Sequence, residues 1–467
     1  MSANSPQDAV ERALAAARCD DCVVIADETS SANLRWAGNS LTTNGVSRSR
    51  QLTVIAVTRS ADGARVGVVS RAGVRDEQIA EIVAEAEHAA AEGSPAEDAA
   101  PLVTSDDAAG RTAAGWDQEP GSTQIGVFAD FARDLGGAFD TAAGAGRRLY
   151  GFAEHGLRST FLGTSAGLRL RHDQPSGRLE LNAKSADLAR SAWAGAGTRD
   201  FSDVDVTALE AGLAQRLAWA ERSVELPAGR YETILPPTAM ADLMIYAYWT
   251  AGAKDALDGR TVFSKPGGGT RIGEKLASLP VSLTSDPAAP GLQCSPFVIA
   301  HASSRDSSVF DNGLPAGRTD WIADGTLAAL TQTRHTARLT GQPVTPAIDN
   351  LIMAAPGATG SLAELVSRTS HGLLLSCLWY IREVDPQTLL LTGLTRDGVY
   401  LVEDGEVTGA VNTFRFNESP VGMLSRITEI GSTEQTLPRE WGDYFTRAAM
   451  PPLRVEGFNM SSVSQAS

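Results

Sequence analysis

The chain has 467 residues, which is too long for one compact core, so we expect two or three domains. A formal net charge of −16 argues against nucleic-acid binding, because phosphates are bound by a cationic surface. No window holds about 20 uninterrupted apolar residues, and the N-terminus lacks a basic segment followed by an apolar one. We therefore expect neither a membrane span nor a secretion signal, and we expect a cytoplasmic protein.

The N-terminal segment shows a helix, a group of strands and a second helix. The predicted elements are a helix at 7–18, strands at 22–26 and 31–36, a turn at 39–44, a hairpin of strands 51–57 and 64–69, and a helix at 76–92. A stretch rich in Ala, Asp, Ser and Pro at 93–121 is the first linker candidate. Cys19 and Cys22 form a C-x-x-C between the first helix and strand, the reverse of the thioredoxin-like order, so we interpret the pair as incidental. The remaining cysteines, Cys294 and Cys377, are isolated, and no disulfide framework is expected.

In the middle segment, residue types alternate as they do in short paired strands, and a helix is predicted on each side of these strands. The predicted elements are a helix at 123–140, paired strands at 147–155 and 159–164, a second pair at 168–172 and 178–184 around a turn at 174–177, and a helix at 206–221. His155 and His172 lie on adjacent predicted strands. As metal ligands they would need a third partner, so we interpret them as satisfied surface or interface histidines.

The C-terminal segment opens with a strand at 225–235 that leads into a helix. Pro236 and Pro237 suit the helix entrance, and Thr238 is the expected N-cap. Apolar residues at 240, 243, 244 and 247 predict one buried face. Further elements are a hairpin turn at Asp324-Gly325, strands at 372–380 and 389–394, and a hairpin over 399–411 around Asp404-Gly405.

Several phrases in this segment resemble the TldD/PmbA family, the modulator-of-gyrase peptidase group. They are Pro227-x-Gly229-x-Tyr231 before Pro236, the glycine-rich turn 259–273 before Gly-Glu-Lys-Leu-Ala-Ser at 273–278, the stretch 309–315 followed by 318–325, the 399–411 hairpin, and Pro-Pro-Leu-Arg-Val-Glu-Gly at 451–457. The resemblance covers nearly all of 7–460. It implies an α+β fold with an N-terminal α/β domain at 1–120, a strand-rich middle domain at 121–224 and a large β-rich C-terminal domain at 225–467.

The resemblance also identifies what this chain lacks. Active TldD-type members carry His-Glu-x-x-x-His on the helix, and aligned on Leu243-Met244 these positions fall on Ile245, Tyr246 and Thr250. An isoleucine cannot bind zinc, and an ordinary phenol stays neutral at pH 7. Active members also place a zinc-binding cysteine upstream of the C-terminus, whereas the corresponding stretch 441–450 has none. The resemblance therefore implies a TldE/PmbA-type chain with no catalytic residue, no metal and no cofactor.

The function implied is that of a non-catalytic subunit in a TldD/TldE-like zinc metallopeptidase complex that degrades or processes unfolded or extended peptides. Its partner would be a TldD-type zinc subunit in a heterodimer, or a second copy of itself. Tyr246, Tyr248 and Trp249 could fill the vacated site, line a peptide groove or pack on a partner. Tyr248, Trp249 and His371 are the candidate groove or pocket residues.

Two other readings stay open. The chain could be a metal-free enzyme of peptide or natural-product maturation, with a pocket around Tyr246, Thr250 and His371. It could instead be a homodimeric peptide-binding protein. Neither reading requires nucleic acid or a membrane.

Overall fold

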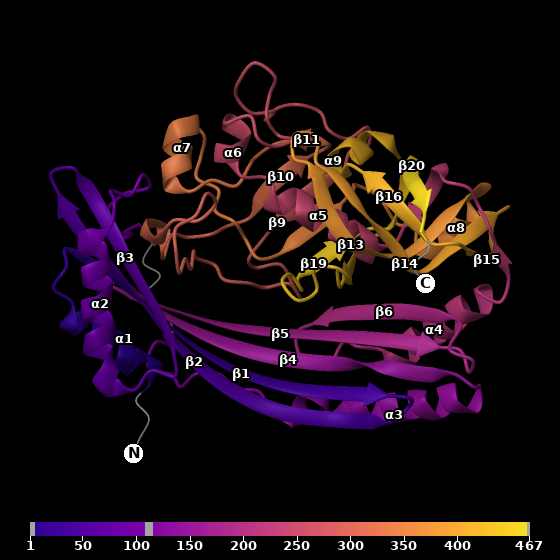
Figure 1. Ribbon diagram of the computed structural model, residues 1–467, viewed down its shortest axis with the longest axis horizontal. Coiled ribbons are helices and arrows are strands. Elements are labelled where there is room, and N and C mark those ends of the chain that lie inside the picture. Colours follow the sequence, from indigo (N-terminus) through magenta and orange to yellow (C-terminus); the bar gives the residue numbers. More distant parts are fainter. Residues whose placement is uncertain (1–4, 108–114, 465–467) are drawn as a thin grey trace.

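The structure is a computed structural model that describes residues 5–107 and 115–464. Its N-terminal half is a long, curved antiparallel sheet, and its C-terminal half is a β-rich body that lies along one face of that sheet (Figure 1). The α+β class predicted from the sequence is confirmed. No helix within the described residues is long and apolar enough to cross a membrane.

The long sheet has six strands in the order β3-β2-β1-β4-β5-β6. Their bounds are β1 Asp21–Ala37, β2 Leu41–Ser60, β3 Gly63–Ala72, β4 Arg148–Thr164, β5 Arg169–Lys184 and β6 Ser191–Thr198. β1 pairs with β4 over its whole length, so strands from the predicted segments 1–120 and 121–224 share one sheet. The division into three domains remains a prediction.

The strands of this sheet are longer than the sequence predicts. The predicted pairs 22–26 with 31–36, 147–155 with 159–164, and 168–172 with 178–184 are each one continuous strand, namely β1, β4 and β5. The predicted turn at 174–177 is wrong, because these residues pair in register with β4. Pro175 is tolerated there because β6 pairs only with Gly177–Lys184, which leaves the other side of β5 free at the proline. The turn predicted at 39–44 is also shorter, since β2 begins at Leu41.

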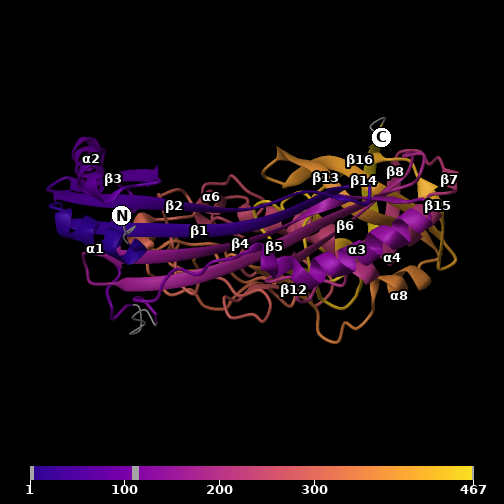
Figure 2. The same ribbon diagram turned by 90° about the horizontal axis from the view of Figure 1, so that it is seen from below.

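Four helices cover one face of the sheet. They are α1 Pro6–Ala16, α2 Ile79–Glu92, α3 Ala129–Gly144 and α4 Val206–Trp219, with short 3-10 turns at Asp76–Gln78 and Ile125–Phe128 before α2 and α3. α1 and α2 lie at one end of the sheet, and α3 and α4 lie at the other (Figures 1 and 2). Because successive side chains of a strand point to opposite faces, the alternate residues of β1, Val24 and Ala26 at one end and Leu34 and Trp36 at the other, pack under these helices.

The C-terminal half contains two further sheets. The first has the order β11-β10-β9-β12-β19-β18, and the second has the order β13-β8-β20-β16-β14-β15-β7, with β17 paired to β20. The first sheet consists of β9 Ser282–Ser285, β10 Thr319–Ala323, β11 Thr326–Leu327, β12 Leu351–Ala354, β18 Glu434–Thr436 and β19 Ala448–Met450. The second consists of β7 Ser223–Val224, β8 Gly229–Leu235, β13 His371–Asp385, β14 Leu390–Glu403, β15 Glu406–Val411, β16 Phe414–Glu418, β17 Ile427–Ile430 and β20 Leu453–Val463.

Both hairpin turns predicted from Asp-Gly pairs are present. Asp324 and Asp404 have φ values of 47° and 49°, and the glycines that follow also have positive φ. This is the backbone conformation that a two-residue turn between right-twisted strands requires. The helices of this half are α5 Pro237–Trp249, α6 Ala253–Leu257, α7 Arg334–Thr340, α8 Leu362–Ser367 and α9 Pro420–Met423, with 3-10 turns at Val309–Asp311 and Leu424–Arg426.

Helix α5 lies between the two C-terminal sheets and contacts β13 on one side and β18 and β19 on the other. Its predicted N-cap is wrong: the helix begins at Pro237, and the hydroxyl of Thr238 instead donates to the carbonyl of Leu437 at 2.6 Å. The helix ends at Trp249. The Thr250 hydroxyl donates to the carbonyl of Ala247 at 3.0 Å, and a separate short helix follows.

Candidate functional site

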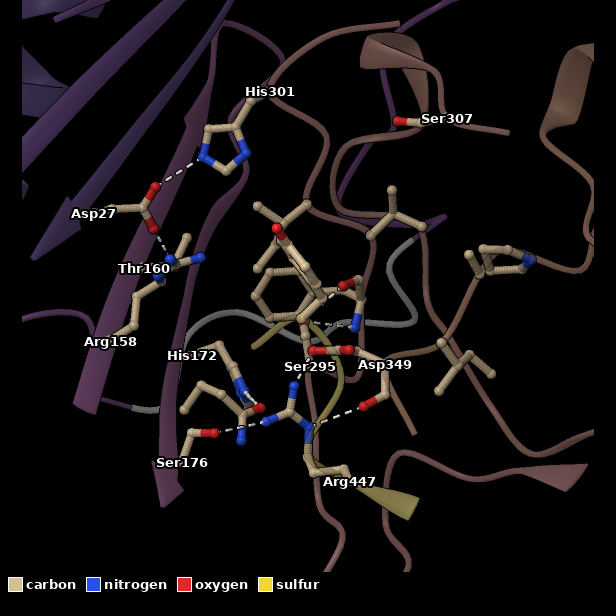
Figure 3. A pocket seen from close by; sticks show the side chains of 18 of the residues that line it. Asp27, Arg158, Thr160, His172, Ser176, Ser295, His301, Ser307, Asp349 and Arg447 are labelled. Atoms are coloured by element: carbon tan, nitrogen blue, oxygen red, sulfur yellow. Dashed lines mark hydrogen bonds and ion pairs between the residues drawn. The ribbon is translucent and has the colours of Figure 1, made fainter. Parts of the chain in front are cut away.

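A cavity of about 620 Å³ lies between the long sheet and the loops of the C-terminal half. We call it the sheet-face cavity. Its sheet wall consists of alternate residues of β1, β4 and β5, and its other wall comes from loops around 295–311, 346–349 and 443–447. Figure 3 shows the polar side chains that meet there.

The strand register explains why the cavity forms at this point of the sheet. On the face opposite the four helices, side chains of β1, β4 and β5 form rows across the three strands. The successive rows are Ile25–Leu162–Leu170, Asp27–Thr160–His172 and Thr29–Arg158–Gln174. The first row is apolar and packs into a core with Phe297 and Phe310 of the C-terminal half. The next two rows are polar, so the same face opens into a lined cavity there.

Two pairs of acidic and basic side chains lie in the lining of this cavity. The Nε2 atom of His301 lies 2.7 Å from Asp27 Oδ2, and the Thr160 hydroxyl donates to Asp27 Oδ1 at 2.5 Å (Figure 3). Burial alone would raise the pKa of Asp27, but the hydrogen bonds from His301 and Thr160 hold it below its ordinary value. On the opposite side, Arg447 pairs with Asp349. These pairs fix the walls of the cavity without filling it.

The third motif position of α5, Thr250, caps the end of the helix, and the first two lie against the C-terminal core. Ile245 is fully buried. Tyr246 is half-buried, and burial together with the nearby Glu383 carboxylate raises the pKa of its phenol. Thr250 donates its proton to backbone carbonyls of the helix, so its hydroxyl stays protonated and is held against the helix end.

The loop between β18 and β19 packs directly on these positions. Within this loop, the 437–447 segment places the ring of Trp441 5.6 Å from Tyr246 and 5.3 Å from Trp249. Phe445 lies 6.3 Å from Trp249. We call Tyr246, Trp249, Trp441 and Phe445 the aromatic cluster. It joins the motif helix to the segment in which the sequence analysis found no cysteine.

Asp242 holds the 437–447 segment on α5. This carboxylate is completely buried, and it accepts the backbone N–H of Arg439 at 3.1 Å and of Glu440 at 2.9 Å. The indole N–H of Trp441 donates to the Asp242 carbonyl at 2.9 Å. Burial raises the pKa of Asp242 well above its ordinary value. The sequence analysis gave this residue no role.

The three predicted groove residues do not share one pocket. Tyr248 is buried, and its hydroxyl donates to the carbonyl of Ile348 at 3.0 Å and accepts the N–H of Ile348 at 2.7 Å. Trp249 is 41% exposed and lines a separate cavity of about 500 Å³ together with Glu383. His371 begins β13 twelve residues before Glu383, which is about 40 Å of extended strand.

Comparison with known proteins defines the family. The model of the PmbA/TldA metallopeptidase C-terminal domain matches residues 228–462, about half of the chain. The chain belongs to the PmbA/TldD family. No curated protein matches it.

Solved structures of the family are similar over nearly the whole chain. TldE from Thermococcus kodakarensis has a TM-score of 0.77 at 16% identity, covering 97% of this chain and 99% of its own. A proposed modulator of a DNA gyrase from Thermotoga maritima has a TM-score of 0.73 at 16% identity, with 97% and 99% covered. A proposed modulator of DNA gyrase from Bacteroides thetaiotaomicron has a TM-score of 0.73 at 15% identity, with 98% of each chain covered. At this identity the likeness shows the fold alone.

The residues at the motif positions of this PmbA/TldD chain do not fit a zinc ion. Zinc in proteins takes thiolate, imidazole or carboxylate ligands. Ile245 has no donor atom, Tyr246 is held in its neutral form, and Trp441 stands in the segment where active relatives have their cysteine. Elsewhere in residues 5–107 and 115–464, no group of three or more His, Cys, Asp and Glu side chains could hold a metal ion.

The two histidines of the middle segment also stay apart. His155 is buried on the helix face of the sheet, where its ring nitrogens bond to the Thr123 hydroxyl and the Arg199 carbonyl, both at 2.8 Å. His172 points to the opposite face and lines the sheet-face cavity. Partial burial lowers the pKa of His172, and its Nε2 atom lies 3.0 Å from the Gln174 amide oxygen.

The sequence does carry a signal for the cavity, although it was missed. Along β1, apolar residues at 23 and 25 give way to polar residues at 27 and 29 on the same face, and β5 changes in the same way after Leu170. A polar stretch on the inner face of an otherwise apolar strand indicates a hydrated or ligand-lined surface. Only the register shows that these stretches of separate strands coincide.

Proposed function

We propose that this chain is a non-catalytic TldE-type subunit that binds extended peptides and acts with a TldD-type zinc peptidase subunit. The aromatic cluster carries the proposal. Metal-assisted hydrolysis needs a Lewis acid, an activated water and a group that moves a proton. At the corresponding place this chain has packed rings, a neutral phenol and a hydroxyl that is bonded to its own helix. These groups close the region by packing and supply none of the three requirements.

The sheet-face cavity supports the peptide-binding part of the proposal. Its lining combines apolar side chains such as Phe297 and Ile299 with a few polar groups, among them Arg158 and His172. Such a combination is typical of ligand sites, in which apolar area supplies affinity and sparse polar groups fix orientation. The proposal places the subunit in the cytoplasm, where free thiols persist, and all four cysteines of the chain are free.

The decisive experiment separates metal binding, cleavage and complex formation. The full chain is purified, its zinc content is measured by mass spectrometry, and peptide cleavage is assayed alone and after mixing with a TldD-type subunit from the same genome. We expect substoichiometric zinc, no cleavage by the chain alone and faster cleavage by the mixture than by the partner alone. One tightly held zinc per chain, or cleavage by the chain alone, would refute the proposal.

Two controls locate the chemistry. The TldD-type subunit, purified in the same way, should hold stoichiometric zinc. Replacing the glutamate of its His-Glu-x-x-x-His motif by glutamine should abolish cleavage by the mixture, because the proposed general base resides in the partner.

A homodimeric peptide-binding protein is the second candidate. This candidate keeps the sheet-face cavity as the peptide site and needs no zinc-carrying partner. Light scattering that gives a stable homodimer, together with no effect on a TldD-type partner, would select this candidate. The geometry gives no support to an enzyme pocket around Tyr246, Thr250 and His371, because the extended length of β13 separates His371 from the other two.

A further inference from the structure

We propose that Arg158 anchors a carboxylate group of the peptide that binds in the sheet-face cavity. This inference rests on the proposed peptide-binding function and adds a chemical preference to it. The argument depends on where Arg158 lies, on the pairing of the charges around it and on the geometry of its guanidinium group.

Arg158 stands in the middle of the cavity's sheet wall. Its neighbours across the strands are Thr29 of β1 and Gln174 of β5, and Thr160 follows it on the same face of β4. On its other side is Gly156, where even an added Cβ would meet no atom closer than 3.9 Å. Gly156 therefore leaves open space on the same face of the strand.

Most charge partners in the cavity lining are already assigned. Four of its five carboxylates have basic partners of their own. These pairs are Asp27 with His301, Asp311 with Arg334, Asp349 with Arg447, and Asp443 with Arg178. The fifth carboxylate, Asp306, lies against Gly252 of the C-terminal half. Among the residues that the structure describes, Arg158 has no hydrogen-bond or ion-pair partner, although its positive charge is close enough to attract the carboxylates of Asp27 and Asp349.

A guanidinium group offers five N–H donors in a planar fork that matches the two oxygens of a carboxylate. With its donors unused and the neighbouring carboxylates already paired, Arg158 is suited to a carboxylate brought by the ligand. An extended peptide carries that group at its C-terminus and on Asp or Glu side chains. The apolar residues of the opposite wall, Phe297 and Ile299, can contact the rest of such a chain.

The test compares two peptides that differ only in one charge. Both are extended peptides of Ala, Gln and Ser with an uncharged coumarin at the N-terminus; one ends in a free carboxylate and the other in an amide. Binding to the full chain is measured by fluorescence anisotropy. We expect the free acid to bind about tenfold more tightly than the amide, as a charge-assisted bidentate pair would give. In Arg158→Gln this preference should disappear while the amide keeps its affinity.

The matched control is Arg48→Gln. Arg48 is an exposed arginine of β2 outside the cavity, and its replacement changes the net charge by the same amount. This control should retain the tenfold preference, which separates a local anchor from a general electrostatic effect.

A third peptide with an amidated end and one internal glutamate locates the carboxylate. If it binds as tightly as the free acid, Arg158 also accepts an acidic side chain; if it binds like the amide, Arg158 is specific for the C-terminus. Equal affinity of acid and amide, or a preference that survives in Arg158→Gln, would overturn the anchor and leave the peptide-binding function standing. Failure of every peptide to bind would overturn both.

Discussion

The aromatic cluster and the sheet-face cavity share one segment of chain but have opposite character. From the 437–447 segment, Trp441 and Phe445 pack on α5, while Asp443, Tyr444 and Arg447 line the cavity. The contacts on the α5 side are rings and buried hydrogen bonds. Those on the cavity side are polar groups in contact with solvent.

The proposed function uses this difference, because it assigns peptide binding to the cavity side and no zinc chemistry to the α5 side. Packing of the rings and the bonds to Asp242 hold the segment in place, so the wall of the cavity does not depend on a metal. Substitutions in the aromatic cluster should therefore lower stability, whereas substitutions in the cavity should chiefly change binding.

The largest loss of stability is expected from Asp242→Ala. This change removes the acceptor of two backbone N–H groups, and each unsatisfied group costs about 1–3 kcal/mol. We therefore expect the free energy of unfolding to fall by about 3 kcal/mol. Urea denaturation followed by circular dichroism measures the change, and hydrogen exchange of the 437–447 segment should rise with it. Asp134→Ala, at an exposed carboxylate of α3, is the control and should stay within about 0.5 kcal/mol of the parent chain.

Trp441→Ala should be the next most disruptive change. The ring contacts Tyr246 and Trp249, and its N–H bonds to the Asp242 carbonyl. Truncating a fully buried tryptophan costs about 3–5 kcal/mol, and since Trp441 is only partly buried we expect about 2 kcal/mol. Trp441→Phe should recover part of the loss by restoring a ring without the hydrogen bond. Equal stability of the alanine variant and the parent chain would show that the cluster does not hold the segment.

Local sequence patterns predicted many of the helices and strands, but missed others such as β6 and did not predict how long the strands are. The Asp-Gly turns at 324 and 404 were predicted because their backbone conformation is a local property. By the same local reasoning, the residues around Gly156 and Pro175 indicate that a strand ends there and a new one begins. In the structure, pairing with neighbouring strands supplies the hydrogen bonds that carry β4 and β5 through these positions.

The part of the candidate site that lies on one helix, α5, could be predicted from the sequence. The family resemblance identified Ile245, Tyr246 and Thr250, and the structure places the Tyr246 ring 5.6 Å from that of Trp441. The sheet-face cavity could not be derived in the same way. It brings together Asp27, Arg158 and His301, which are far apart in the sequence and meet only through the register of the long strands and a C-terminal loop.

In the cavity, Asp27→Asn should cost about 1 kcal/mol at neutral pH, since hydrogen bonds to an ionised group are lost. The folded state holds the pKa of Asp27 below its ordinary value, so the ionised carboxylate stabilises the fold. That stability is fully present above the unfolded pKa of about 3.9 and is lost as the pH falls through the folded pKa. Urea denaturation from pH 7 to pH 3 should therefore show the parent and Asp27→Asn converging at low pH. A gap that stays constant would contradict this.

The smallest effect on stability is expected from Arg158→Gln. No described residue forms a hydrogen bond or ion pair with this side chain, so its removal should change the free energy of unfolding by less than about 0.5 kcal/mol. The substitution removes the attraction between the Arg158 charge and the carboxylates of Asp27 and Asp349. Water in the cavity weakens this attraction, so its loss costs little. Urea denaturation at pH 7 measures the change, with Arg48→Gln alongside. A loss above about 1 kcal/mol would assign Arg158 to the structural framework. Unchanged stability combined with loss of the carboxylate preference would distinguish the cavity, where the Arg158 charge is available for a ligand, from the aromatic cluster, where the rings pack on one another.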